Sequence, residues 1–282
     1  AITGVSTGLG MRGFKPILEI MFGDFITLCT DQIVNGATKF SWMYGEHLPT
    51  PLFIRTPMGG GRGYGPTHSQ TLESLFLGVP NLTILSPSIF HDPGIVLTKA
   101  VEKIANPTLF IENKLLYPQK IIEPDEKNKI NDFHFSFINK ASDSFPTIAL
   151  AIEKDMKPDV CLIAYGRMPN IALNASRNLF FEEELIVKVL VPSLINPIPV
   201  DDFTDSVNES GKLLIVDEGV KLGGWGSEVS NQVYEKCFNN LSAPIEIIGA
   251  PHTPVPSSKN LEDQYFPNQK LIENKIKRLY EK

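Results

Sequence analysis

A histidine beside a glycine-rich loop is the residue of this sequence best placed for chemistry. Residues 59–65 read Gly-Gly-Gly-Arg-Gly-Tyr-Gly, and His68 follows three residues later. Because ligands bind in loops at the carboxyl ends of parallel strands in open α/β sheets, we interpret His68 as a candidate general acid–base or anion partner. The alternative is that it only caps the next helix. We interpret the other histidines as surface residues (His47, His91, His134) or as part of a rigid proline loop (His252).

The glycine stretch itself fails the specific tests for a phosphate-binding loop. A P-loop ends in Gly-Lys-Ser/Thr, whereas Gly65 is followed by Pro66-Thr67. A dinucleotide site needs an acid after the next strand, whereas Leu85 is followed by Ser86-Pro87. Two interpretations remain: a flexible turn, or a close approach of the backbone to some ligand, which glycine permits because it lacks a Cβ atom.

A pair of acids forms the second candidate site. Asp217-Glu218-Gly219 ends a strand and leads into Gly223-Gly224-Trp225-Gly226. Two such carboxylates could bind a metal or act as acid and base. A structural role, in which they hold the glycine turn or a subunit contact, is the favoured interpretation. Metal sites with Cys/His spacing and a Gly-x-Ser-x-Gly elbow are absent from the sequence.

Strands that alternate with helices must position these residues. Apolar runs predict strands at 16–20, 52–55, 82–85, 108–112, 160–164, 186–191, 213–216 and 245–248. Helical periodicity predicts helices at 24–39 (with Asp24 as N-cap), 90–104, 171–181, 200–210, 226–238 and 269–280. This alternation indicates parallel βαβ units, and therefore an α/β fold of two parallel-sheet domains.

Residues 117–159 interrupt the rhythm. They contain four prolines and a charged run at 123–132, and a short alternating stretch at 133–137 suggests one extra strand. We interpret this segment as an interdomain linker. The predicted organisation is therefore a first domain over 1–117, a linker over 118–157 and a second domain over 158–282.

Composition excludes several classes of protein. At about 150 residues per domain, 282 residues suggest two domains. A hydrophobic content of 42% with 21% charged residues is typical of a globular protein and not of a disordered one. The net charge of −6 argues against nucleic acid as a partner, and no apolar run reaches the ~18 residues that span a membrane. Three cysteines indicate reduced thiols and not a disulfide framework.

Several blocks of sequence carry a family resemblance. The chain resembles the beta subunit of the thiamin-diphosphate-dependent decarboxylating component of 2-oxo acid dehydrogenase complexes, whose relatives include pyruvate, branched-chain 2-oxo acid and acetoin dehydrogenases. The matching blocks follow the family's order and cover nearly the whole chain; they are residues 19–25 with 31–35, 51–70, 106–117, 164–167, 216–224, 253–256 and 261–268. Residues 118–158 match least.

The resemblance implies a fold and a site. Residues 1–117 should be most of a transketolase-like pyrimidine-binding domain, and residues 158–282 a transketolase C-terminal domain. The resemblance implies that Phe25 stacks on the aminopyrimidine of thiamin diphosphate, that Met21 lies beside that ring, and that His68 faces the 2-oxo acid and the incoming lipoyl group. It also implies that the glycine stretch lets the loop pass close to the partner subunit.

The resemblance further implies partners. The cofactor is shared with an alpha subunit or alpha-like region, which holds the diphosphate and the Mg²⁺, so that no metal ligand is expected in this chain. A second beta copy and a lipoyl acyltransferase are the other expected partners. The implied compartment is the cytoplasm of a bacterium or the mitochondrial matrix of a eukaryote.

One departure from the family and two alternatives accompany this interpretation. The family's catalytic glutamate lies upstream of the segment that matches Ala1, and no acid precedes Glu19. We therefore expect the first domain to be incomplete at its N-terminus, and the chain alone to be inactive and to bind thiamin diphosphate negligibly. The alternatives are a transketolase-like two-carbon transferase, and a purely structural assembly module, which is the favoured role for residues 158–282.

Overall fold

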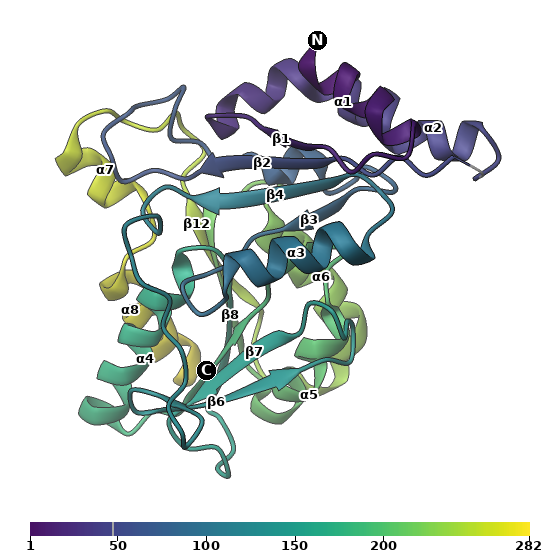
Figure 1. Ribbon diagram of the computed structural model, residues 1–282. Coiled ribbons are helices and arrows are strands. Elements are labelled where there is room, and N and C mark those ends of the chain that lie inside the picture. Colours follow the sequence, from purple (N-terminus) through teal and green to yellow (C-terminus); the bar gives the residue numbers. More distant parts are fainter. Residues whose placement is uncertain (47) are drawn as a thin grey trace.

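Two β-sheets organise the chain, and the computed structural model describes them over residues 1–46 and 48–282. The first sheet has the strand order β1-β2-β4-β3-β10, and the second has the order β12-β11-β8-β9-β7-β6-β5. Figure 1 shows the first sheet in the upper part of the molecule and the second sheet below it.

The first sheet is parallel except at one edge. Its strands are β1 (Ile17–Glu19), β2 (Phe53–Met58), β3 (Thr83–Leu85), β4 (Thr108–Asn113) and β10 (Leu194–Asn196). The first four pair in parallel, whereas β10 pairs antiparallel to β3. Because β10 comes from the second half of the chain, this sheet is built from both halves.

The second sheet is also mixed. Its strands are β5 (Lys129–Ile130), β6 (Phe133–Ile138), β7 (Thr147–Ala151), β8 (Val160–Ala164), β9 (Val187–Val191), β11 (Leu213–Val220) and β12 (Glu246–Ala250). Strands β12, β11, β8 and β9 are parallel, and β7, β6 and β5 add to them antiparallel. The two α/β domains expected from the sequence are confirmed, but with mixed sheets in place of purely parallel ones.

The three antiparallel strands come from the segment that the sequence suggested as a linker. The stretch 133–137, expected to form an extra strand, lies in β6. All five residues of β7 are buried, because this strand lies between β9 and β6. Strands β5, β6 and β7, within residues 129–151, thus belong to the second sheet. The exact domain boundaries stay a prediction.

Helices cover both sheets. The α-helices are α1 (Ile2–Met11), α2 (Thr38–Met43), α3 (Pro93–Lys103), α4 (Met168–Glu183), α5 (Val200–Ser210), α6 (Trp225–Cys237), α7 (Lys259–Tyr265) and α8 (Gln269–Tyr280). Four short segments are helices of other kinds: η1 (Gly23–Cys29), η3 (Glu73–Phe76) and η4 (Phe238–Asn240) are 3₁₀-helices, and η2 (Gln32–Ala37) is a π-helix. Asp92 caps α3 by accepting hydrogen bonds from the amides of Gly94 and Ile95. None of the helices within the described residues is both long and apolar enough to cross a membrane.

Alternating side chains on the strands build the core. In the first sheet, Phe53 and Phe110 pack with α3, whereas their neighbours Ile54 and Leu109 point to the opposite face. That opposite face belongs to one continuous cluster that also contains Trp225 and other residues of the second domain. The second sheet packs α4 and α8 on its other face. The shared cluster therefore couples the two domains through apolar contact.

Candidate active site

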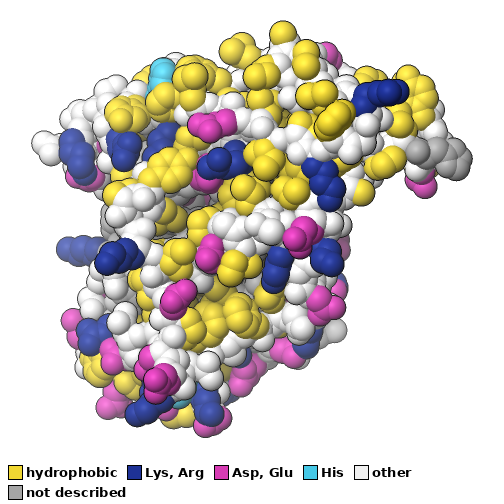
Figure 2. Space-filling model, in the orientation of Figure 1, with side chains coloured by type: hydrophobic (Ala, Val, Ile, Leu, Met, Phe, Trp, Pro, Cys, Tyr) yellow, Lys and Arg dark blue, Asp and Glu magenta, His cyan; other side chains and the backbone are white. Residues whose placement is uncertain are grey.

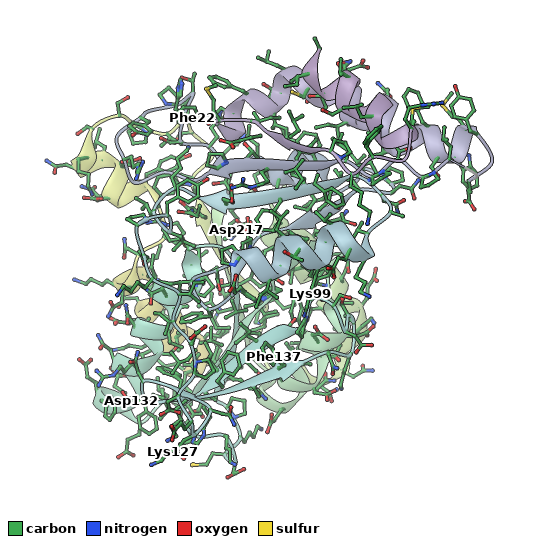
Figure 3. All side chains as sticks on the ribbon, in the orientation of Figure 1. Phe22, Lys99, Lys127, Asp132, Phe137 and Asp217 are labelled. Carbon is green, nitrogen blue, oxygen red and sulfur yellow. The ribbon has the colours of Figure 1, made fainter. Side chains whose placement is uncertain are left out.

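His68 lies against two phenylalanine rings at the carboxyl ends of β1 and β2. The centroid of its ring is 4.7 Å from that of Phe22 and 5.4 Å from that of Phe25, and both contacts are edge-on. Phe22 and Phe25 lie on the turn after β1, and His68 lies in the loop after β2. Because these two strands pair in parallel, their loops emerge at the same edge of the sheet. Figure 3 labels Phe22 at this edge of the upper sheet.

The structure brings together two of the three residues singled out from the sequence. Phe25 is half-buried beside His68, whereas the side chain of Met21 is 68% exposed. Phe22 is a member of the cluster that sequence reasoning missed. Its signal was its place in the same turn, three residues before Phe25, but nothing in the sequence shows that both rings turn toward the histidine. The roles of all three predicted residues stay predictions.

A buried lysine fixes the backbone around His68. Lys114, directly after β4, is 3% exposed, and its Nζ donates hydrogen bonds to the carbonyl oxygens of Gly59 (3.2 Å) and His68 (2.5 Å). The same nitrogen lies 5.0 Å from the centroid of the Phe22 ring, in a cation–π arrangement. Burial lowers the pKa of the Lys114 ammonium from its ordinary value. One side chain thus links both ends of the loop that carries the histidine.

Asp24 does not cap a helix as expected. The predicted helix 24–39 is replaced by η1, η2 and α2 in succession. Asp24 is buried, and its Oδ1 accepts hydrogen bonds from the backbone amide and the side-chain Nε2 of Gln70. Its Oδ2 is buried without a partner among the residues that the structure describes. The carboxylate is therefore committed to the loop after His68, which explains why it is not available to a helix N-terminus.

The amides of the glycine-rich loop are occupied by protein carboxylates. Glu218 accepts a hydrogen bond from the amide of Gly60 (3.1 Å), and Glu262 accepts from Gly61 (2.7 Å) and Gly63 (2.8 Å). A Cβ atom at Gly60 would lie 2.2 Å from the ring of Phe266, so only glycine fits there. Of the two interpretations of the loop, close approach of the backbone to another group is what this structure shows, and the group is the second domain.

Two buried carboxyl groups meet between the domains. The hydroxyl of Tyr165 donates to Glu73 of η3 and lies 3.2 Å from Asp217 of β11. Burial, together with the charge of Asp217, raises the pKa of Glu73 to about 8, and burial also raises the pKa of Asp217. Asp217 accepts the amides of Gly219 and Gly226. The structural interpretation of this acid is confirmed, because it holds the glycine turn; Figure 3 labels it between the two sheets.

One of the remaining histidines, His91, contradicts the expectation of a surface position. His91 is buried, not on the surface, and burial lowers its pKa to about 4. Its Nδ1 accepts a hydrogen bond from the amide of Ser88, which gives it a structural place before α3. His134 lies half-buried in β6, His252 is exposed, and His47 lies outside the described residues. Within the ranges 1–46 and 48–282, no three His, Cys, Asp or Glu side chains are arranged to hold a metal ion.

Comparisons with known proteins agree with this architecture. Residues 1–120 match the family model of the transketolase pyrimidine binding domain, and residues 150–272 match that of the transketolase C-terminal domain. The beta subunit of acetoin:2,6-dichlorophenolindophenol oxidoreductase from Cupriavidus necator is 34% identical over 96% of this chain and 75% of its own length. The mitochondrial pyruvate dehydrogenase E1 component subunit beta-1 from Arabidopsis thaliana is 30% identical over 98% of this chain and 72% of its own length.

A solved structure shares the fold. A split-gene transketolase, described as an inactive beta4 tetramer, superposes with a TM-score of 0.71 at 18% identity, covering 99% of this chain and 81% of that chain. The fold and the two domain models define a transketolase-like protein of two α/β domains. Within that class, the chain belongs to the family of the beta subunits of acetoin and 2-oxo acid dehydrogenases. The resemblance drawn from the sequence blocks is thereby confirmed, and the family implies dependence on thiamin diphosphate.

Proposed function

We propose that this chain supplies the aminopyrimidine side of a thiamin diphosphate site, for oxidative decarboxylation of a 2-oxo acid and acylation of a lipoyl group. The cluster of Phe22, Phe25 and His68 at the carboxyl ends of β1 and β2 carries the proposal. A half-buried aromatic ring beside an imidazole suits a flat heteroaromatic ring, and an offset aromatic contact contributes about 1 kcal/mol beyond the burial of area. These residues therefore fit the cofactor that the family implies.

Each residue of the cluster has a distinct task in this proposal. Phe25 packs against the aminopyrimidine, and the backbone of Met21 lies beside it. The hydroxyl of Thr67 lies 3.0 Å from Nδ1 of His68, which leaves Nε2 to exchange a proton with the 2-oxo acid or the lipoyl group. When bound, the cofactor supplies the nucleophilic carbon and the electron sink that decarboxylation requires.

The rest of the site is assigned to partners. We assign the diphosphate and the Mg²⁺ to an alpha subunit or alpha-like region. A large apolar surface supports such an assembly: Figure 2 shows hydrophobic side chains gathered over α1 and α2. Within residues 2–43, the large hydrophobic side chains of Ile2, Val5, Phe14, Leu28, Trp42 and Met43 are each at least 62% exposed. Patches of this kind mark interaction surfaces, and we assign this one to the alpha partner and a second beta copy.

Residues 158–282 are proposed to serve assembly, including the docking of a lipoyl acyltransferase. Tyr234 and Phe238 support this role, because both rings are exposed on one side of α6 and η4 and lie 5.0 Å apart. The transketolase alternative has less support, because the solved transketolase shares only the fold at 18% identity. We place the protein in the bacterial cytoplasm or the mitochondrial matrix, since its relatives include bacterial and mitochondrial proteins.

A substitution of the histidine tests the proposed function. In the enzyme assembled with its alpha partner, His68→Ala should lower the rate of lipoyl acylation by about 100-fold or more, the size of a lost general acid–base contribution. Affinity for thiamin diphosphate, measured by calorimetry, should stay unchanged, because the imidazole does not hold the cofactor. Unchanged turnover with 2-oxo acids, or activity with ketose phosphates instead, would contradict the proposal.

A further inference from the structure

The loop that carries His68 is held by a residue of the other domain. Glu262 of α7 is 0% exposed, and its two carboxylate oxygens each accept a hydrogen bond, from the amides of Gly61 and Gly63. In the chain, Glu262 lies 201 positions from Gly61 and 199 positions from Gly63. Glu262 therefore connects the second domain to the backbone of the glycine-rich loop in the first.

Among the residues that the structure describes, the glycine-rich loop supplies the hydrogen-bond donors to the Glu262 carboxylate. Within the described residues, no Lys, Arg or His nitrogen lies within ion-pair distance of its carboxylate, whereas the neighbouring Glu218 pairs with Arg167 at 3.1 Å. A buried carboxylate without a counter-ion is costly unless it accepts hydrogen bonds. Gly61 and Gly63 have φ angles of +90° and +71°, and such successive turns of the backbone direct amides at an anion. Both oxygens of Glu262 are thus satisfied only while the loop keeps this shape.

The other end of the same loop leads directly to the imidazole. His68 follows Gly63 by five residues, and Lys114 ties the carbonyl of His68 to that of Gly59. The loop is consequently fixed by Glu262 from the second domain and by Lys114 from the first. With both ends of its loop fixed, the ring of His68 stays against those of Phe22 and Phe25.

We propose that Glu262 is a positioning residue, which holds the glycine-rich loop so that the second domain sets the place of His68. The role of His68 rests on the proposed function, but the effect of Glu262 on the loop does not. Breaking one of its two charge-assisted hydrogen bonds should loosen residues 59–68 without unfolding either domain.

The test compares Glu262→Gln with Glu246→Gln in the enzyme assembled with its alpha partner. Glutamine keeps the shape of the side chain but turns an N–H group toward one of the two amides, so one hydrogen bond is lost. Glu246, on β12, is the matched control. Its carboxylate forms ion pairs with Lys275 and Lys282 and does not contact the glycine-rich loop. Glu262→Asp, which retains the charge but is too short to reach both amides, carries the same test should the glutamine variant fail to fold.

Two measurements decide the outcome. Hydrogen exchange of the peptide that spans residues 59–68 should become about tenfold faster in Glu262→Gln and not in Glu246→Gln. The kcat of lipoyl acylation should fall about tenfold, while the affinity for thiamin diphosphate and the melting temperature stay near those of the parent. Unchanged exchange overturns the inference, and so does faster exchange with unchanged kcat. An active His68→Ala enzyme would instead overturn the proposed function, and the exchange result would stand.

Discussion

At the scale of single residues, the candidate site depends on unusual neighbours for ordinary side chains. The ring of His68 packs against two phenylalanine rings. The adjacent Lys114 is buried, and its ammonium faces carbonyl oxygens and an aromatic ring. The imidazole is half-buried in this arrangement, and its Nδ1 lies 3.0 Å from the hydroxyl of Thr67. The chemistry that we propose follows from this environment more than from the histidine alone.

Replacement of Phe25 separates cofactor binding from the acyl transfer assigned to His68. In the assembled enzyme, Phe25→Ala should weaken thiamin diphosphate binding by about five- to tenfold, because one aromatic contact of about 1 kcal/mol and its buried area are lost. Calorimetric titration with the cofactor measures the change. Phe110→Leu, a buried residue of β4 that packs with α3, is a control for general loss of core packing. Equal affinity in Phe25→Ala and the parent enzyme would show that this ring does not contact the cofactor.

The pKa of Glu73 predicts how stability changes with pH. Because burial and Asp217 raise the pKa of Glu73 to about 8, above the ordinary value of 4.5, the folded chain binds more protons than the unfolded chain between these values. The free energy of unfolding therefore loses the contribution of this group as pH rises from about 5 to about 8. Glu73→Gln keeps an oxygen for the Tyr165 hydroxyl but cannot ionise. Its stability relative to the parent should increase over that pH range, as measured by urea unfolding at each pH.

A control variant separates the effect of Glu73 on stability from that of an ordinary carboxylate. Glu246→Gln changes an outer carboxylate whose pKa is lowered by Lys275 and Lys282, so its difference from the parent should be flat between about pH 6 and pH 8. A flat difference for Glu73→Gln as well would mean that Glu73 is ionised in the folded protein.

At the scale of elements, loops and short strands carry the contacts that join the domains. The edge strand β10 extends the first sheet, and Asn196 at its end donates from its side chain to the carbonyl of Leu82 (2.7 Å). The glycine-rich loop reaches the other way and packs on α7 and Phe266. The second domain therefore contacts the first at both β10 and the active-site loop.

A pair of glycines tests the packing of this loop. Gly60→Ala should destabilise the chain by about 1–3 kcal/mol, because the new methyl group would overlap the ring of Phe266. Gly8→Ala is the control: nothing lies within 4 Å of a Cβ atom there, and alanine favours the helix α1 by up to about 1 kcal/mol. Urea unfolding of both variants gives the comparison. Equal stability of the two would show that the loop does not pack against Phe266 in solution.

At the scale of the whole molecule, the candidate site lies at one edge of the first sheet, and the helices that cover this sheet expose an apolar surface. Figure 2 shows this surface over α1 and α2 along the upper side of the molecule, and Figure 3 labels Phe22 of the site toward the left of the same side. A site beside an uncovered apolar surface is what a shared active site between subunits requires. We expect covering of this surface and completion of the site to occur together.

Substitution of Leu28 tests that expectation. Leu28 of η1 is 83% exposed, so Leu28→Asp should leave the isolated chain folded. In contact with a partner the new carboxylate would be buried unpaired, which should weaken assembly by about 100-fold or more. Light scattering of the chain mixed with its alpha partner measures the assembly. Met156→Asp, on an exposed residue between β7 and β8 of the second sheet, is the control and should assemble normally. Normal assembly of Leu28→Asp would mean that this surface is not the interface.

The sequence by itself determined the α/β class and most strands, and the family resemblance of its blocks predicted that Phe25 and His68 lie near each other, as their rings do. Short motifs and runs of consecutive apolar residues are local signals, and buried parallel strands display them strongly. The same local reasoning gave a single helix at 24–39, where polar contacts of Asp24 and the turns of η1 and η2 intervene. It also placed His91 at the surface, because an exposed and a buried histidine have the same local pattern.

Only the tertiary structure decided how the two domains share the site. Glu218 and Glu262 meet the glycine-rich loop from 158 and about 200 residues away, and the Glu73–Tyr165–Asp217 cluster joins three separate segments. No periodicity encodes such contacts, since they arise when the apolar faces of two sheets pack and bury polar groups that must then find partners. The histidine was visible in the sequence, whereas the carboxylate that we propose to hold its loop became visible only once the second domain was packed against the first.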